Sequence, residues 1–489
     1  MELFKKILLV LLGVLLTLLT IFLVNTFRLG HTQIEPGERV QVEWDRDAMI
    51  DRYSQSIRYK TISGDDGFER DTTEFRAFLD FIEESYPLVH QKLEKTLFNY
   101  FTPLYFWQGS DDSLDPILLM GHYDVVPIDS TDIDGWEYEP FSGAIADGYI
   151  WGRGTLDNKF NVMALLETAE YLLGSDYTPS RGIYFTFGHD EEIGGREGAL
   201  EVSRYLQQQG VNLYYVLDEG GGIIDGALPV SKPVAMIGTA EKGYLSLELI
   251  ARTSGGHSSQ PPQDMAVVML SEAILELQKN QFPARLDGAA EDMFDAIASK
   301  LPFSAKLIYG NRWMMDRLFI SSLASDPSTA PMVRTTIAPT IMRAGVKDNV
   351  LPNEARAVIN FRLLPGDSFE SVRDHVRNVI DNDNITIQDY GTIQTSPTRV
   401  SSVNTSIYRK LQQAIVDQYP DVYVAPYLVS GATDSRHFSN LTDQVFRFAP
   451  MKLDADALSI IHGTNERVSI ESVERAIDFY VNLIRSSTE

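Results

Sequence analysis

The sequence predicts an α/β protein with a mainly parallel sheet, an inserted α+β domain and an N-terminal transmembrane helix. Short apolar strand patterns alternate with helical patterns over much of the chain, as they do in parallel sheets covered by helices. After residue 243 the order changes to strand, helix, strand, helix, which indicates a separate domain inserted into the first. A long apolar run opens the chain and predicts the membrane helix.

Residues 1–27 are predicted to form a signal anchor. Lys5 and Lys6 precede an uncharged, mostly apolar run over residues 7–24, which is nearly long enough to cross a bilayer as a helix. Because no small-x-small cleavage site follows it, we expect the run to stay attached, and a cleaved signal peptide is the alternative. The lysines favour a cytoplasmic N-terminus, which predicts a single-pass protein with its main body outside the cytoplasm. Residues 28–45 are polar and are assigned as a linker.

Residues 46–242 are assigned as the first part of the α/β domain. The predicted elements are a helix at 72–86, a strand at 117–120, a helix at 161–173, a strand at 183–187, a helix at 199–209 and a strand at 214–217. Side chains that can bind metal follow each of the three strands. Open α/β sheets place their sites at this edge, beyond the carboxyl ends of the strands.

Residues 243–395 are assigned as the inserted domain. Its predicted elements are a half-exposed strand at 244–252, a helix at 265–278, a strand at 357–363, a helix at 369–380 and a short strand at 385–387. One face of the second strand carries Ala357, Ile359, Phe361 and Leu363. The segment 280–339 elaborates this domain without a pattern that assigns it a role. Residues 396–489 then return to the α/β domain, with helices at 406–418 and 470–484.

Composition limits the classes of function. A net charge of −26 argues against nucleic acid as a partner, because phosphate binding requires basic patches. With 489 residues the chain is too long for one ordinary core. The chain contains no cysteine, so any metal must be held by histidine, aspartate and glutamate.

Several positions together could build a site for two metal ions. The candidate ligands are His122, Asp157, the pair Glu191 and Glu192, Asp218 and His462. Asp157 is the candidate bridge between the ions. Because adjacent glutamates point in different directions, one of the pair can bind metal while the other acts as a base. Asp124 lies two residues after His122 and is predicted to orient its imidazole.

Each position also has an ordinary structural explanation. Asp157 precedes a predicted helix and could be its N-cap. Asp218 precedes a run of glycines and could be a turn residue. A solitary His462 could be structural. The prediction of a hydrolase therefore depends on the combination of positions.

The motifs that carry these residues resemble a known family. In chain order they read Gly-His-Tyr-Asp, Gly-Arg-Gly-Thr-Leu-Asp, Asp-Glu-Glu-Ile-Gly-Gly, Asp-Glu-Gly, Ser-Gly-Gly-His-Ser-Ser and His-Gly-Thr-Asn-Glu. This set is similar to the zinc metallopeptidase family of aminoacylase-1, carboxypeptidase G and carboxypeptidase S. The resemblance is nearest to the carboxypeptidase S branch, whose secreted relatives handle N-fatty-acyl amino acids. It covers nearly everything from about residue 45 to the C-terminus.

The resemblance implies a zinc-peptidase fold, in which the inserted domain is a lid and dimerisation domain, with two zinc ions per subunit. One zinc would be held by His122, Asp157 and Asp218. The other would be held by Asp157, Glu192 and His462. A homodimer formed through the inserted domain is also implied.

The resemblance assigns further roles near the reacting bond. Glu191 would be the general base, and Asp124 the carboxylate behind the ligands. His257, in the inserted domain, would stabilise the oxyanion of the tetrahedral intermediate. Asn349 and Arg362 would hold the substrate near its carboxylate, which a guanidinium matches well in shape.

The expected function is hydrolysis of an amide bond next to an amino acid with a free carboxylate, by a membrane-anchored dizinc enzyme. A small peptide is the first candidate substrate, as in carboxypeptidase S. An N-fatty-acyl amino acid, hydrolysed or synthesised, is the alternative. For such a substrate the aromatic segment 309–319 could line an apolar tunnel, although ordinary core is the simpler interpretation. A rival of another class is a non-catalytic, membrane-tethered binding protein on the same fold.

Overall fold

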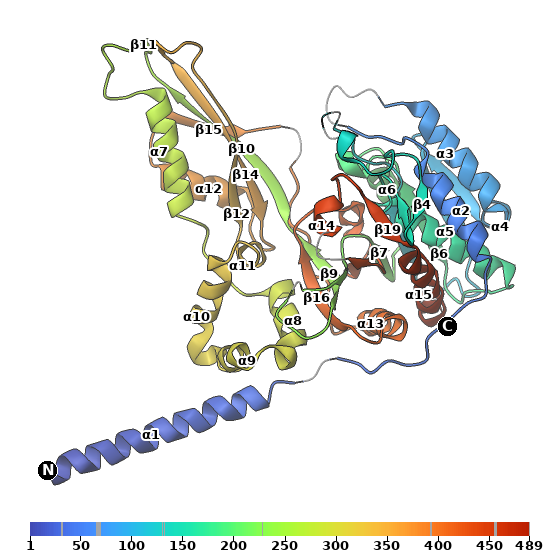
Figure 1. The fold of residues 1–489 in the computed structure, drawn as a ribbon, viewed down its shortest axis with the longest axis horizontal. Coiled ribbons are helices and arrows are strands. Elements are labelled where there is room, and N and C mark those ends of the chain that lie inside the picture. The colour runs from blue at the N-terminus through green and yellow to red at the C-terminus, as the bar shows by residue number, and fades with distance from the viewer. Residues whose placement is uncertain are drawn as a thin grey trace. The chain divides into compact units, whose positions relative to one another are not determined.

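The computed structural model describes residues 1–30, 33–64, 70–129, 131, 133–226, 228–391, 394–453 and 457–488. The chain divides into two compact units. The α/β unit comprises His31–Thr239, Asp292–Lys300 and Ser401–Glu489. The inserted unit comprises Met1–Gly30, Ala240–Glu291 and Leu301–Val400. Figure 1 shows the helices and strands of both units.

A mixed sheet forms the centre of the α/β unit. Its strands follow the order β1 (Glu94–Phe98), β2 (Thr102–Trp107), β6 (Ile183–Gly188), β3 (Ile117–His122), β7 (Tyr215–Asp218), β17 (Val445–Arg447), β9 (Val234–Glu241), β8 (Gly222–Ile224) and β18 (Lys452–Leu453), and β16 (Tyr423–Val429) pairs with β9. The central strands β6, β3, β7 and β17 are parallel. The strands β1 and β2, and likewise β8 and β9, pair antiparallel on either side.

The prediction of a mainly parallel sheet is therefore corrected to a mixed one. The alternating pattern predicted β3, β6 and β7, three of the four parallel strands at the centre, but it did not predict β17. Antiparallel partners need only a short turn between them. The pair β1 and β2 is joined in this way, without the intervening helix that marks a parallel strand.

Helices cover both faces of this sheet. Ile117 and Leu119 of β3 belong to the core shared with α5 (Lys159–Gly174), α13 (Ser406–Gln418) and α15 (Ile470–Thr488). Leu118 and Met120 point to the opposite core, which α6 (Ala199–Gln208) covers. The apolar run of β3 is typical of a strand that is buried on both faces.

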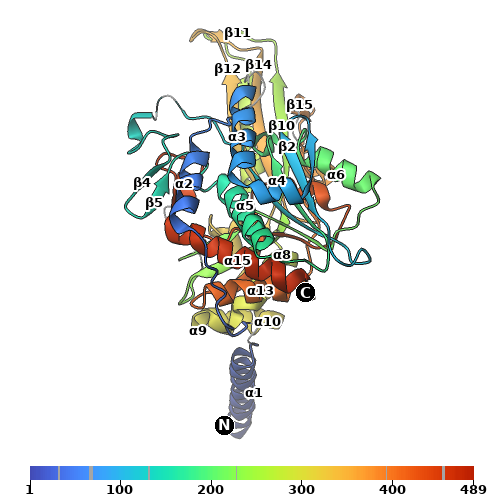
Figure 2. The same ribbon diagram turned by 90° about the vertical axis from the view of Figure 1, so that its right-hand side faces the viewer.

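The helix α5 holds the centre of the first layer. It packs against β3, α15 and α4 (Pro87–Lys92), and it is buried on nearly all sides. Figure 2 looks onto this layer, where α2 (Arg46–Ile57) and α3 (Thr72–Ser85) lie beside it. The segment 33–44, assigned as a linker, has no regular secondary structure. Within it Gly37 donates to Asp417 of α13 and Val42 donates to Asp478 of α15.

The parallel strands bring their carboxyl ends to one edge of the sheet. In the register of β3 and β6, His122 lies opposite Gly188. On the other side, Leu119 of β3 lies opposite Leu217 of β7. The last residue of β3 and the loops that follow β6 and β7 are therefore neighbours.

The inserted unit contains a second, antiparallel sheet. Its order is β12 (Thr336–Ala344), β14 (Glu354–Leu363), β10 (Gly243–Arg252) and β15 (Ile385–Asp389). The face of β14 with Ala357, Ile359, Phe361 and Leu363 packs in one core with α7 (Ala266–Lys279) and α12 (Phe369–Ile380), which confirms the predicted face. A short pair, β11 (Gly256–His257) and β13 (Val350–Leu351), extends from this sheet.

The predicted half-exposed strand at 244–252 is instead buried on both faces. Ser246 and Glu248, expected on an open face, are buried. Glu248 accepts hydrogen bonds from Arg356 of β14 and Gln388 of β15, because β10 lies between these two strands. A central position in the sheet, which the sequence pattern does not reveal, explains the difference.

Two further segments of the chain are helical. The apolar N-terminal run is α1 (Glu2–Phe27). Among the described residues it alone is long and apolar enough to cross a membrane, a description that a signal sequence also meets. The segment 280–339 contains α8 (Gly288–Ile297), α9 (Phe303–Tyr309), α10 (Arg312–Ser325) and α11 (Ala330–Val333).

Candidate metal centre

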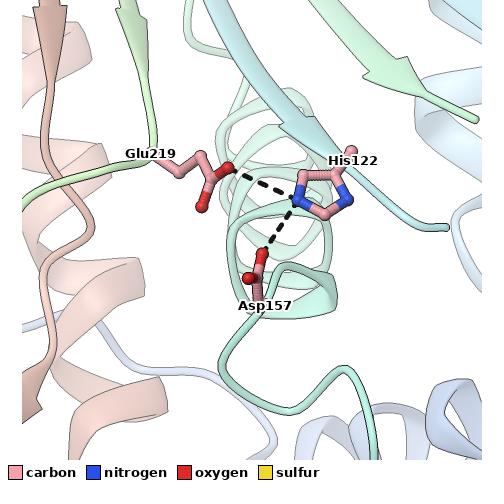
Figure 3. A group of neighbouring side chains, drawn as sticks. All are labelled: His122, Asp157 and Glu219. Carbon is pink, nitrogen blue, oxygen red and sulfur yellow. Dashed lines mark hydrogen bonds and ion pairs between the residues drawn. The ribbon is translucent and has the colours of Figure 1, made fainter. Parts of the chain in front are cut away.

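His122 closes β3, and its ring is held from behind. Its Nδ1 lies 3.0 Å from the carbonyl oxygen of Asp124 and 3.3 Å from Oδ1 of the same residue. Its Nε2 lies 3.0 Å from Oδ1 of Asp157 and 3.4 Å from Oε1 of Glu219. Figure 3 shows the two carboxylates converging on this nitrogen. An imidazole held through one nitrogen presents the other as a ligand.

Asp157 lies between two imidazoles. Its Oδ1 faces His122, and its Oδ2 lies 2.9 Å from Nε2 of His462. Burial opposes ionisation, but hydrogen bonds from the two histidines hold the pKa of Asp157 below its usual value. Asp157 is not the N-cap of α5, since Asn158 occupies that position. Two oxygens directed at two histidines form the arrangement that a bridging carboxylate requires.

Two groups of side chains share Asp157. His122, Asp157 and Glu219 form the first, and Asp157, Glu192 and His462 form the second. In each group the ligand atoms all lie within 4.8 Å of one another. Oε2 of Glu192 lies 3.3 Å from Nε2 of His462. Four of the predicted ligand positions are thus brought together.

Asp218 is the predicted ligand that lies in neither group, and Glu219 stands in its place. Asp218 is the last residue of β7, and its Oδ2 accepts a hydrogen bond of 2.8 Å from the backbone N–H of Ser435. Glu219 follows the strand, where its Oε1 faces His122 and its Oε2 accepts from Asn158. Successive side chains at the end of a strand point to opposite sides. Glu219 is the middle residue of the Asp-Glu-Gly motif, in which its neighbour Asp218 was the predicted ligand.

Asp124 connects His122 to the two glutamates. Its Oδ1 and Oδ2 accept hydrogen bonds of 3.2 Å from the backbone N–H groups of Glu191 and Glu192 respectively. Both glutamates lie in the 3₁₀ turn Glu191–Ile193 that follows β6. Glu192 points to His462, while Oε2 of Glu191 lies 3.8 Å from Nε2 of His122. The adjacent glutamates therefore take different positions, as their adjacency predicted.

A buried ion pair joins the loops of Asp157 and His462. Oε1 of Glu466 accepts from the backbone N–H groups of Gly154, Leu156 and Asp157, while its Oε2 binds Arg153. Arg153 in turn donates to the carbonyl oxygen of His462. Glu466, which the sequence analysis did not single out, is thus a positioning residue for both loops. Its signal was its place in the His-Gly-Thr-Asn-Glu motif.

The backbone at these loops is unusual. Gly154 has a φ of +89°, and a Cβ there would lie 2.7 Å from Cγ1 of Val125, so the position requires glycine. His462 has a φ of +60°. A left-handed conformation is uncommon for a residue other than glycine.

Buried carboxylates accumulate at this edge of the sheet. Burial, together with the charge of Asp157, raises the pKa of Glu192 to about 7 and that of Glu219 to about 8. Burial raises the pKa of Glu191 as well. Hydrogen bonds to Asp157 and Glu192 raise the pKa of His462 to about 10. Carboxylates packed this closely repel one another unless cations lie between them.

The donor set fits divalent metal ions. Imidazole nitrogens and carboxylate oxygens are ligands that zinc accepts. Oε1 of Glu192 is buried without a hydrogen-bond partner, so an acceptor points into the second group of ligands. The two groups of side chains supply such ligands within 4.8 Å of one another.

The predicted substrate residues lie in the inserted unit. His257 is exposed on β11, and its Nδ1 lies 2.8 Å from Oγ of Ser259. Asn349 is next to it, because its carbonyl oxygen accepts from the N–H of Ser258. Arg362 lies on β14 with its guanidinium 4.7 Å from the ring centre of Tyr244. Their roles toward the substrate stay predictions.

Comparison with known proteins identifies relatives along nearly the whole chain. The profile of "Peptidase family M20/M25/M40" matches residues 118–486. A probable carboxypeptidase S-like 2 of Dictyostelium discoideum is 39% identical over 447 residues, which is 90% of this chain and 85% of the relative. The N-fatty-acyl-amino acid synthase/hydrolase PM20D1 of Xenopus tropicalis is 37% identical over 483 residues, which is 97% of this chain and 93% of the relative.

Solved structures share the fold. The M20 family metallo-carboxypeptidase Sso-CP2 from Sulfolobus solfataricus has a TM-score of 0.64 at 20% identity and covers 89% of this chain and 98% of its own. Human carnosine dipeptidase 1 has a TM-score of 0.59 at 16% identity, with 90% and 96% covered. At such identities the likeness shows the fold alone.

Replacing Glu466 is expected to weaken metal binding and stability together. Glu466→Ala leaves Arg153 buried without its carboxylate, which costs about 3–5 kcal/mol, and frees the loop of Asp157. We expect metal affinity to fall by about 10–100-fold, as for other residues that support ligands. Competition with a chelator and chemical denaturation measure the two effects. The control Glu474→Ala removes a surface pair with Arg46 and should cost at most about 1 kcal/mol; wild-type metal affinity in Glu466→Ala would contradict the positioning role.

Zinc should stabilise the protein more at pH 8 than at pH 5.5. In the metal-free protein, Glu192 and Glu219 bind protons more tightly when folded than when unfolded, because their pKa values rise from 4.5 to about 7 and about 8. The folded state therefore loses stability as pH rises from the ordinary glutamate pKa of 4.5 to these values, by up to about 1.4 kcal/mol per pH unit and group. His462, with a pKa of about 10, acts in the same direction above pH 6.5. Urea denaturation with chelator and with zinc, at both pH values, measures how much zinc increases the free energy of unfolding. The same increase at pH 5.5 and at pH 8 would contradict this account.

Proposed function

This chain belongs to the peptidase family M20/M25/M40 and is a hydrolase, and from that premise we propose that it is a membrane-anchored dizinc enzyme. It cleaves the amide bond next to an amino acid with a free carboxylate. The observation that carries the proposal is Asp157, whose two oxygens face His122 and His462. The rival interpretation, a non-catalytic binding protein, is rejected by the family membership.

Two zinc ions per subunit would be held by the two groups of ligands. His122, Asp157 and Glu219 would hold one ion, and Asp157, Glu192 and His462 the other. When bound, the pair supplies Lewis acidity that polarises a carbonyl group and increases the acidity of water. The absence of cysteine and the excess of buried carboxylates both support this assignment.

Glu191 is the proposed general base. It belongs to neither group of ligands, yet its carboxylate lies within 3.8 Å of the ring of His122. Burial raises its pKa, which suits a carboxylate that must first accept a proton and then release it. Glu191 would take the proton from the attacking water and deliver it to the leaving nitrogen. Asp124 holds the base in place by accepting a hydrogen bond from the backbone N–H of Glu191.

The inserted unit is proposed to supply the groups that recognise the substrate. His257 would donate to the oxyanion that develops on the carbonyl carbon. Arg362 would pair with the free carboxylate and Asn349 would bind beside it. The position of Asn349 next to the β11 strand of His257 supports a shared role for the two. As in the sequence-based expectation, this unit is also the proposed contact of a homodimer.

Two substrate classes are supported by relatives. A small peptide is the first, because the relative named carboxypeptidase S-like 2 is 39% identical. An N-fatty-acyl amino acid is the second, because the relative named N-fatty-acyl-amino acid synthase/hydrolase aligns over 97% of this chain. An apolar anchor helix would keep the enzyme at the surface where such lipids occur. In both classes we propose that α1 spans the membrane once, with the α/β unit outside the cytoplasm.

Glu191→Gln is expected to abolish turnover without loss of zinc. The amide cannot take a proton from water, so kcat should fall by about 10²–10⁴-fold. Zinc content is measured by elemental analysis of the same preparation. The matched control Glu201→Gln changes an exposed glutamate of α6 and should leave kcat unchanged. If Glu191→Gln instead lost a zinc ion, Glu191 would be a ligand and its role as base would be refuted.

A substrate panel tests recognition of the carboxylate and separates the two classes. We expect C-terminal amidation of a good substrate, or Arg362→Ala, to lower kcat/KM by about 10–100-fold, since each removes a charge-assisted hydrogen bond of about 1.5–3 kcal/mol. Combined, the two changes should cost little more than either alone. Comparing a dipeptide with a long-chain N-acyl amino acid identifies the class. The control Arg252→Ala removes a surface pair with Glu354; fully additive losses would show that Arg362 does not meet the carboxylate.

A further inference from the structure

The helical hairpin α9–α10 of the inserted unit has no part in the proposed chemistry. It lies in the segment 280–339, for which the sequence suggested no role, and it packs against the C-terminal end of α1. Both α1 and the hairpin belong to the inserted unit. Figure 1 shows α9 next to this end of α1.

Specific polar contacts dock the hairpin on α1. Asn311, at the turn between α9 and α10, is fully buried. Its side-chain NH₂ donates to the carbonyl oxygen of Phe22 at 3.1 Å, and its Oδ1 accepts from Asn25 at 3.1 Å. Because a buried amide left without partners is costly, these bonds fix the position of the turn on α1.

Aromatic rings extend the same contact. The ring of Trp313 meets that of Phe22 edge-on, with their centres 6.1 Å apart. The ring of Phe303 of α9 lies tilted against that of Phe27, with their centres 6.3 Å apart. Phe22 belongs to the apolar run of α1, so the hairpin meets α1 where this run ends.

The outer face of the hairpin is apolar and exposed. Trp313, Met314 and Leu318 of α10 are 62%, 61% and 55% exposed. Leaving such side chains in water forgoes about 1.5–3 kcal/mol each relative to burial. Tyr309 and Phe319, in contrast, are buried and pack on each other.

The charge of the hairpin is opposite to that of the chain. Its basic residues are Lys306, Arg312 and Arg317, against the single acid Asp316, in a chain of net charge −26. Arg317 is exposed on the same helix as the apolar side chains. Basic residues, an exposed tryptophan and a helix lying beside the end of a membrane span are typical of an interfacial element.

We propose that α9–α10 is a membrane-interface hairpin whose partner is a phospholipid surface with anionic headgroups. Trp313, Met314 and Leu318 enter the boundary between headgroups and acyl chains, and Lys306 and Arg317 face the phosphates. This inference rests on the proposed insertion of α1, because the end of the apolar run sets the depth of the hairpin. The inserted unit is then held by two neighbouring contacts with the membrane instead of one flexible tether.

The absence of cysteine allows a direct test on the full-length protein in lipid nanodiscs. Single cysteines at Met314→Cys and Leu318→Cys carry an environment-sensitive fluorophore. Leu12→Cys in α1 reports on the anchor. Leu275→Cys, equally exposed at 56% on α7 of the same unit, is the matched aqueous control. We expect the labels at 314 and 318 to show blue-shifted emission, quenching by spin-labelled lipid and a several-fold loss of iodide quenching relative to 275.

The outcomes separate the hairpin from the anchor. If the label at Leu12 is in lipid while those at 314 and 318 behave like 275, the hairpin proposal is overturned and the anchor stands. If the label at Leu12 is aqueous, the anchoring itself fails.

Changing the lipid composition tests the role of the basic residues. Protection of the labels at 314 and 318 from iodide should increase when phosphatidylglycerol replaces part of the phosphatidylcholine. The double substitution Lys306→Glu and Arg317→Glu should remove this increase. Equal protection in both lipids would overturn the anionic preference.

Discussion

The shared carboxylate of Asp157 is the interaction on which the rest of the site depends. His122 at the end of β3 and His462 near the C-terminus approach it from opposite sides, at 3.0 and 2.9 Å. Glu219 and Glu192 complete the two groups around it. Charges of one sign packed so closely are unfavourable without cations. The architecture of the sheet edge is therefore organised for metal ions, whatever substrate the enzyme acts on.

Two further carboxylates hold the ligands by binding backbone N–H groups. Asp124 accepts from Glu191 and Glu192 and so places the base and a ligand at once. Glu466 accepts from the loop of Asp157 and, through Arg153, binds the loop of His462. Neither residue belongs to the ligand groups, yet each connects segments that are distant in sequence. A site built this way tolerates little change behind its ligands.

Much of the fold was predictable because its signals are local. The helices α12 and α13 begin and end where the helical spacing predicted them, and the side chains of Ser368 and Thr405 cap their first turns. The antiparallel flanks of the sheet were missed because no crossover helix marks them. The strand β10 was expected to be half-exposed but is central, so its polar side chains are buried against neighbouring strands. The hairpin α9–α10 was not predicted because its outer face is apolar. The usual difference between an apolar inner face and a polar outer face is therefore missing from its sequence.

The sequence by itself determined which residue types serve the site, which motifs carry them and to which family the chain belongs, because these depend on short stretches of chain. It also singled out His122, Asp157, Glu192 and His462, which the structure brings together around one carboxylate. Only the tertiary structure showed that Glu219 faces His122, whereas Asp218 binds the backbone N–H of Ser435. Adjacent side chains at a strand end point in opposite directions, and the N–H of Ser435, 217 positions away along the chain, already binds the carboxylate of Asp218. A contact between residues so far apart in sequence leaves no sign in the short motif that contains Asp218 and Glu219.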